Sequence, residues 1–144
     1  HKELHSVAIT AIPPPIFHFL KSHQAELIRR ATEADKRKHG VEDEAARHYI
    51  DLDHFTEWIE PSSWFTEDTL KKRGILPWNI EFVYMSLVYE FSKDTLDTEN
   101  IIRLCADLGH YIAEAHVPLH TSSNYNDQFF WPNRHSRTLG NPCL

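Results

Sequence analysis

Glycine, cysteine and long hydrophobic runs are all scarce in this chain of 144 residues. Four glycines leave no glycine-rich loop of the kind that cradles phosphate groups. The two cysteines, Cys105 and Cys143, form no recognisable disulfide framework, and Cys105 falls on an apolar helical stripe, where a small core residue is expected. No stretch approaches the roughly 18 apolar residues of a membrane-spanning helix. We therefore expect neither a transmembrane segment nor nucleophilic-cysteine or phosphate-loop chemistry.

Positive charge is also in short supply, because 15 lysines and arginines face 21 aspartates and glutamates, for a formal net charge of −6. This balance argues against a basic surface for phosphate backbones or anionic membranes. Carboxylates can, however, recruit metal cations, which then carry positive charge toward an anionic substrate. The abundant residue is histidine, with 11 copies, many of them a few residues from a carboxylate. Since 41% of the residues are hydrophobic, we expect one folded domain with a core.

The pattern of apolar residues predicts an all-α fold, because strand-like alternation is missing. Thr66 suits the start of a helix and Gly74 its end. The charged segment 32–46 is aperiodic and is expected to be a loop. The stretch 78–92 is apolar on nearly every side, so we expect it to be the central buried helix. Helices are predicted over about residues 15–31, 66–74, 78–92 and 99–116.

The last of these helices carries polar residues at a spacing that suits metal binding. His110 and Glu114 lie one turn apart on the face opposite the apolar stripe, so both side chains can reach one cation. Pro118 breaks the helix and allows His120 to turn back toward this pair. The alternative is a solvated polar face, which is the commoner role of an isolated pair of this kind. The aromatic and apolar residues interleaved with these histidines argue against that alternative.

The segment GHYIAEAHVPLH resembles the His-x-x-x-Asp-x-x-x-x-x-His signature of the zinc-dependent phospholipase C superfamily, which includes the single-strand-specific nucleases. The resemblance implies the multi-helix, all-α domain of that superfamily. It also implies that His110 and Glu114 bind one zinc ion, that Glu114 reaches a second ion, and that His120 serves a third. Glu114 stands where the signature usually has Asp, so its bridging geometry departs from the family's pattern.

Two further segments extend the resemblance toward the N-terminus. The segment RHYIDLDHF resembles the family's His-aromatic-x-Asp segment and implies that His48 is a zinc ligand. The family has an Asp ligand thirteen to fifteen residues earlier, which favours Asp35 over Asp43. A histidine near the start of the chain is also a ligand in the family. This implies His1 as a ligand, with His5 as the alternative.

The resemblance implies zinc-dependent hydrolysis of a phosphodiester, with up to three zinc ions and in-line attack of a zinc-bound hydroxide on phosphorus. Asp35, as a ligand near that water, is the candidate to accept its proton. A phospholipid is the favoured substrate and single-stranded nucleic acid is the alternative. A metal-binding remnant without activity is a third interpretation. The resemblance further implies a secreted or periplasmic protein, and we infer no protein partner.

The resemblance covers residues 1–128 and implies that the family domain is incomplete at both ends. The tail, residues 129–144, lacks helical periodicity and lacks the family's Gly-Ile-His stretch with a Glu four residues after that His. Synonymous codons for this tail, read one nucleotide later, restore both features. We therefore predict a frame-shifted tail without two of the zinc ligands, and an incompletely metallated chain. Sequencing the encoding DNA tests this, and an intact frame across codons 125–144 would contradict it.

Overall fold

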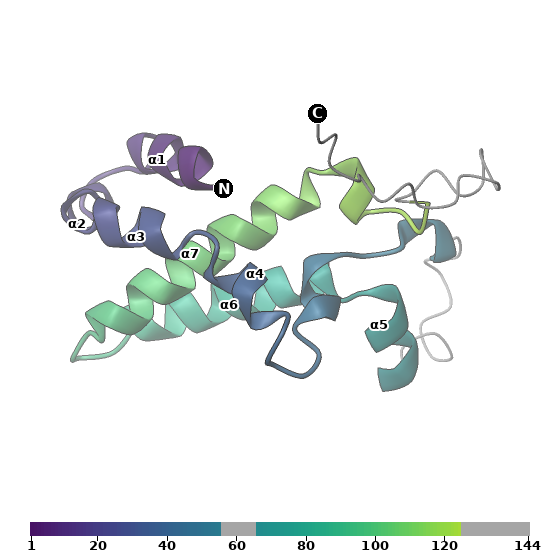
Figure 1. Ribbon diagram of the computed structural model, residues 1–144. Coiled ribbons are helices and arrows are strands. Elements are labelled where there is room, and N and C mark those ends of the chain that lie inside the picture. Colours follow the sequence, from purple (N-terminus) through teal and green to yellow (C-terminus); the bar gives the residue numbers. More distant parts are fainter. Residues whose placement is uncertain (56–65, 125–144) are drawn as a thin grey trace, which may run out of the picture.

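The computed structural model describes residues 1–55 and 66–124, and every regular element in these ranges is helical (Figure 1). No strand occurs there, so the all-α prediction is confirmed. The tail 129–144, with its predicted frame shift, lies outside the described residues, as does Cys143. The elements are α1 (Lys2–Thr10), α2 (Ile16–Ser22), α3 (Gln24–Arg30), α4 (Glu33–Arg37), the 3₁₀ helices η1 (Ala45–His48) and η2 (Leu52–His54), α5 (Glu67–Arg73), α6 (Leu76–Phe91), α7 (Thr98–Ala115) and the 3₁₀ helix η3 (Pro118–His120).

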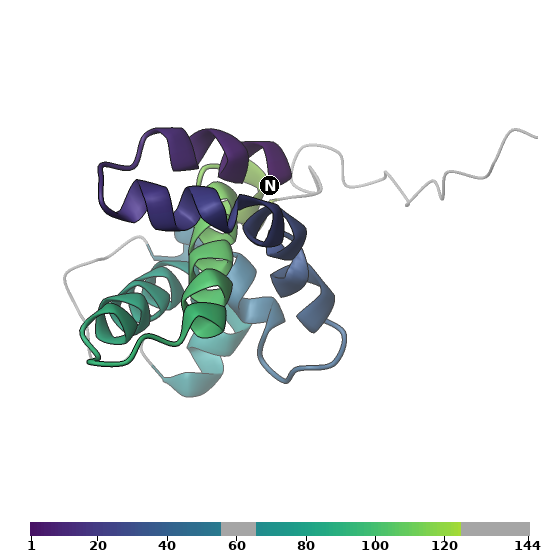
Figure 2. The same ribbon diagram turned by 90° about the vertical axis from the view of Figure 1, so that its left-hand side faces the viewer.

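The central helix is α7, which lies between α6 and the layer formed by α1, α2 and α3 (Figures 1 and 2). Its first turn is capped by Asp97, whose side chain accepts a hydrogen bond from the Asn100 N–H at 3.0 Å. Ile101 on the apolar side is buried, and so are His110 and Glu114 on the polar side, at 1% and 2% exposure. The polar side of this helix is therefore not a solvated face.

The prediction that residues 78–92 form the central buried helix is wrong. Most of this stretch lies in α6, but Phe82 and Tyr89 are 68% and 64% exposed. The helix packs on α7 and η1 along a stripe that includes Val83, while several of its other apolar side chains face solvent. The prediction assumed that a helix with apolar residues on nearly every side is buried. Composition, however, does not show which neighbouring elements cover the helix.

The N-terminal helices cover the other side of α7 through a buried cluster formed by Ile9, Leu20, Leu27 and Ile102. The single helix predicted over 15–31 is interrupted at His23, which lies between α2 and α3. The side chains of Ser22 and His23 both donate to the Phe19 carbonyl, at 2.8 and 2.9 Å. Such bonds compete with the helical pattern of the backbone, which accounts for the break.

The segment that carries His48 is preceded by the short helix α4 and followed by the short helix α5. The predicted loop over 32–46 contains α4, so this part of the chain is more ordered than its charge pattern indicates. The helix predicted over 66–74 is confirmed as α5, because the Thr66 hydroxyl accepts from the Thr69 N–H at 3.3 Å and the helix ends before Gly74.

The position of His48 is fixed by backbone contacts of the two residues that directly follow η1. The Ile50 N–H donates to the His120 carbonyl at 2.9 Å, which joins this segment to the chain that follows α7. Gly74 packs directly against the Tyr49 carbonyl, at a φ of 84° that is rare for residues with a side chain. Within 1–55 and 66–124, no helix combines the length and apolar character needed to cross a membrane.

Candidate metal centre

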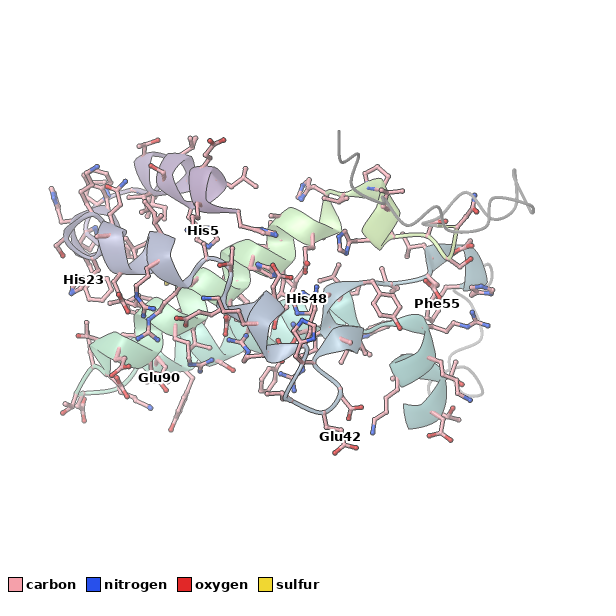
Figure 3. All side chains as sticks on the ribbon, in the orientation of Figure 1. His5, His23, Glu42, His48, Phe55 and Glu90 are labelled. Atoms are coloured by element: carbon pink, nitrogen blue, oxygen red, sulfur yellow. The ribbon has the colours of Figure 1, made fainter. Side chains whose placement is uncertain are left out.

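Four side chains from three elements meet on the polar side of α7. Asp35 comes from α4, His48 from the end of η1, and His110 and Glu114 from adjacent turns of α7. One ligand atom of each residue lies within 4.8 Å of the corresponding atoms of the other three. Figure 3 shows His48 between α4 and α7. The arrangement could hold a metal ion, and it unites four of the residues that the sequence singles out.

The ring of His110 is held from both of its nitrogen atoms. Nδ1 donates to the Ala31 carbonyl at 3.0 Å, so a neutral ring presents an unprotonated Nε2 to the cluster. Nε2 lies 3.2 Å from His48 Nδ1 and 3.3 Å from Glu114 Oε1. Burial alone lowers the pKa of His110, but the hydrogen bond and charge of Glu114 outweigh it and raise that pKa above its usual value. The carboxylate therefore holds a proton on the ring at a place where a cation can replace it.

Glu114 links the two histidines. Its Oε2 accepts a hydrogen bond from His48 Nδ1 at 2.8 Å, while Oε1 faces His110. Burial alone raises the pKa of this carboxyl, but the hydrogen bonds from His110 and His48 lower it to about 2. Lys38 places its ammonium 3.7 Å from Oε1 and 2.9 Å from Asp35 Oδ1. A fixed positive charge therefore already balances part of the negative charge of the cluster.

Asp35 is the most exposed of the four side chains, at 41%, and its Oδ1 lies 3.7 Å from His110 Nε2. It therefore forms the solvent-facing side of the cluster. Asp43, the alternative that the sequence left open, forms an ion pair with Lys71 at 2.9 Å and is not one of the four. The geometry favours Asp35 over Asp43 as the acidic partner of His48.

A further carboxylate, Glu44, lies behind His48 and is missed by reasoning from the sequence. Its Oε1 is 3.5 Å from His48 Nε2, a buried atom without a hydrogen-bond partner among the described residues. If Nδ1 binds a cation, the ring proton resides on Nε2 and faces this carboxylate. Glu44 is itself held by Tyr111 at 2.6 Å and Arg37 at 3.3 Å. In the sequence, the one feature that points to Glu44 is that it lies four residues before His48.

Replacing Glu44 with Gln is expected to weaken zinc binding by roughly 10–100-fold, the usual cost of losing a group that orients a histidine ligand. Competition with a chromophoric chelator on the full chain measures this. Arg47→Gln is the matched control, because Arg47 contacts the same carboxylate at 3.1 Å from a side chain that is 40% exposed. Equal losses in the two variants would rule out an orienting role for Glu44.

The other two residues implied as ligands, His1 and His120, lie beside this cluster and are not part of it. The His1 ring stacks on His110 with ring centroids 4.0 Å apart. His120 donates from Nδ1 to the His48 carbonyl at 3.0 Å. The alternative to His1, His5, is buried, and its two ring nitrogens lie 2.8 and 3.0 Å from backbone carbonyls of His1 and α7. The geometry gives His5 a structural role.

Zinc affinity is expected to fall as the pH drops, because a proton on His110 competes with the ion. The pKa of His110 lies above its usual value, so this competition begins at a higher pH than for an ordinary histidine. Glu114, with a pKa of about 2, stays ionised throughout that range. Where zinc must displace one proton from a ligand, its apparent affinity falls by about tenfold for each pH unit below the pKa of that ligand. Zinc titrations over a pH series check this, and a flat profile would contradict it.

Comparisons of the chain with family models, with curated proteins and with solved structures found no match. The resemblance to the zinc-dependent phospholipase C superfamily therefore stays a prediction. The functional interpretation rests on the geometry of the four-residue cluster and on the chemistry of its donor atoms.

Proposed function

We propose that this chain is a zinc-dependent phosphodiester hydrolase. The observation that carries the proposal is the convergence of Asp35, His48, His110 and Glu114 at one point. Two imidazoles and two carboxylates offer the nitrogen and oxygen donors that zinc accepts readily. Phosphate-ester hydrolysis is a reaction for which such an ion supplies both an activated water and charge neutralisation.

The surroundings of the two imidazoles support a metal rather than a purely structural hydrogen-bond network. Each ring has an acceptor near its outer nitrogen, the Ala31 carbonyl for His110 and the Glu44 carboxylate for His48. Metal-binding histidines are typically oriented by such partners. We propose that these four residues hold one ion, and that any further ion of the family would lie outside this cluster.

We assign different roles in hydrolysis to the residues of the cluster and to Lys38 beside it. Asp35 is the ligand most open to solvent, so we assign it the role of accepting the proton of the attacking water. Lys38 lies 2.9 Å from Asp35 and places a positive charge where a phosphodiester oxygen would approach. His110 and Glu114 are buried, and they fix the ion position from the protein side.

A phospholipid-type phosphodiester is the favoured substrate. The net charge of −6 offers little general attraction to a polyanionic strand, which counts against the nucleic-acid alternative. Metal binding without hydrolysis is the third interpretation, and it is the one that follows if the tail is frame-shifted.

The test is to incubate the full chain, with and without one equivalent of zinc, with dihexanoyl phosphatidylcholine and separately with a single-stranded oligonucleotide. We expect zinc-dependent release of phosphocholine, lost in Asp35→Asn and kept in the control Asp43→Asn. Cleavage of the oligonucleotide alone would establish the nuclease alternative. The same assay on a chain with its tail restored in frame distinguishes an incomplete site from a wrong proposal, which is refuted if neither chain hydrolyses either substrate.

A further inference from the structure

A cavity of about 590 Å³ lies on the side of α7 opposite the metal centre. Its walls come from α1, α2 and α3 on one side and from α6 and α7 on the other. No Asp, Glu, Lys or Arg lines it within the described part of the chain. Three apolar residues of its lining, Leu4, Ile16 and Ile112, are 56%, 42% and 41% exposed, so the cavity opens to solvent through an apolar mouth. Its volume is within the range of ligand sites.

The few polar groups in the lining are already engaged or neutral. His5 lies against backbone carbonyls through both ring nitrogens, and His116 donates from Nδ1 to the Ile112 carbonyl at 2.7 Å. Burial raises the pKa of the Cys105 thiol to about 12, so the thiol stays uncharged. An extended peptide or a sugar-phosphate would leave its own polar groups unpaired in such surroundings. Hydrocarbon is the chemistry that fits.

The cavity and the metal centre lie on different sides of α7, and the first turn of α1 reaches from one to the other. A helix with its side chains is about 10 Å across, so a ligand that reaches around α7 must cover at least that distance. The first turn of α1 spans the same gap, since His5 lines the cavity while the His1 ring stacks on His110. Figure 3 shows His5 on the other side of α7 from His48. Gly109 also lines the cavity and directly precedes His110.

We propose that this cavity binds one hydrocarbon chain of the substrate whose phosphodiester group occupies the metal centre. This proposal rests on the proposed function. It makes the substrate an amphiphile, whose acyl or alkyl chain lies in the cavity on one side of α7 and whose phosphate lies in the metal centre on the other side. The net charge of −6 favours a zwitterionic head group over an anionic one. Single-stranded nucleic acid has no group that suits this cavity.

The test measures chain binding without metal, so that it does not depend on hydrolysis. Dansyl-undecanoic acid is titrated into the full chain in EDTA and then displaced by alkylphosphocholines below their micelle concentration. We expect affinity to rise roughly fourfold for each added methylene, and glycerophosphocholine to displace nothing. Ala113→Trp, which fills the cavity from α7, should bind the probe about tenfold more weakly than Ala115→Trp, a control on the same helix outside the lining.

Ala8→Trp fills the same cavity from α1 and replaces Ala113→Trp if that variant does not fold. Affinity independent of chain length, or equal binding by the filling and control variants, would overturn the proposal. A chain that sediments as a dimer and binds no probe would also overturn it and assign the cavity to a second copy. Probe binding without zinc-dependent hydrolysis, in both the full chain and the chain with its tail restored, would leave the cavity as a hydrocarbon site and refute the function. Hydrolysis without probe binding would support the function and overturn the assignment of the cavity.

Discussion

Replacing His110 with Ala is expected to weaken zinc binding by more than about 100-fold, beyond the loss typical of an orienting group. The Nε2 atom faces both His48 and Glu114, so its removal takes one of the two imidazoles out of the cluster. Hydrolysis should be lost with the ion. The helix should persist, because alanine is the residue most favourable to helix formation. Isothermal titration with zinc and circular dichroism on the full chain measure the two effects.

His116→Ala is the matched control for this change. His116 lies on the same helix but is exposed, and its ring Nδ1 donates to the local Ile112 carbonyl. His23→Ala, in the layer above α7, should likewise leave zinc binding unchanged. Similar losses in all three variants would point to a folding defect and would remove His110 from the site.

Gly74→Ala is expected to destabilise the folded chain by about 3 kcal/mol, because it combines a disfavoured backbone conformation with a steric overlap. The φ of 84° at Gly74 is strained for any residue with a side chain, and a Cβ there would overlap the Tyr49 carbonyl. Relief requires a shift of the segment that carries His48. We therefore expect weaker zinc binding as well as a lower urea midpoint.

Gly40→Ala provides the comparison, since a Cβ at Gly40 would meet nothing within 4 Å and its φ is not positive. That change should be neutral or stabilise the chain by about 0.4–1 kcal/mol, through a less flexible unfolded state. Urea unfolding followed by circular dichroism compares the two variants. If both had the same midpoint, the close packing of Gly74 on the His48 segment would be wrong.

Local spacing was enough to predict part of the site and part of the fold. Helical periodicity alone places His110 and Glu114 on one face of a helix, because they are separated by four residues, whereas their role as ligands needed the resemblance as well. The all-α class and the limits of α5 follow in the same way from periodicity, from Thr66 and from Gly74. These features depend on contacts between near neighbours, which a sequence displays directly.

The rest of the centre depends on contacts between distant parts of the chain. His48 meets His110 across 62 residues, and the Ala31 carbonyl that orients His110 is a backbone group with no side-chain signature. The sequence pointed to His48 and Asp35 only through the resemblance. Glu44 carries a weak signal, four residues before His48, which becomes meaningful once η1 places both beside α7. The exposure of α6 was mispredicted because burial depends on neighbours that a single helix does not specify.

Zinc-edge X-ray absorption of the full chain, loaded with one equivalent of zinc, tests the central claim most directly. We expect one ion per chain with two imidazole ligands, oxygen in the remaining positions, and Zn–N distances of about 2.0–2.1 Å. His48→Ala should remove one imidazole from the spectrum and lower the zinc content. A sulfur ligand, or a spectrum unchanged in His48→Ala, would show that zinc binds elsewhere and that Asp35, His48, His110 and Glu114 do not form a metal site.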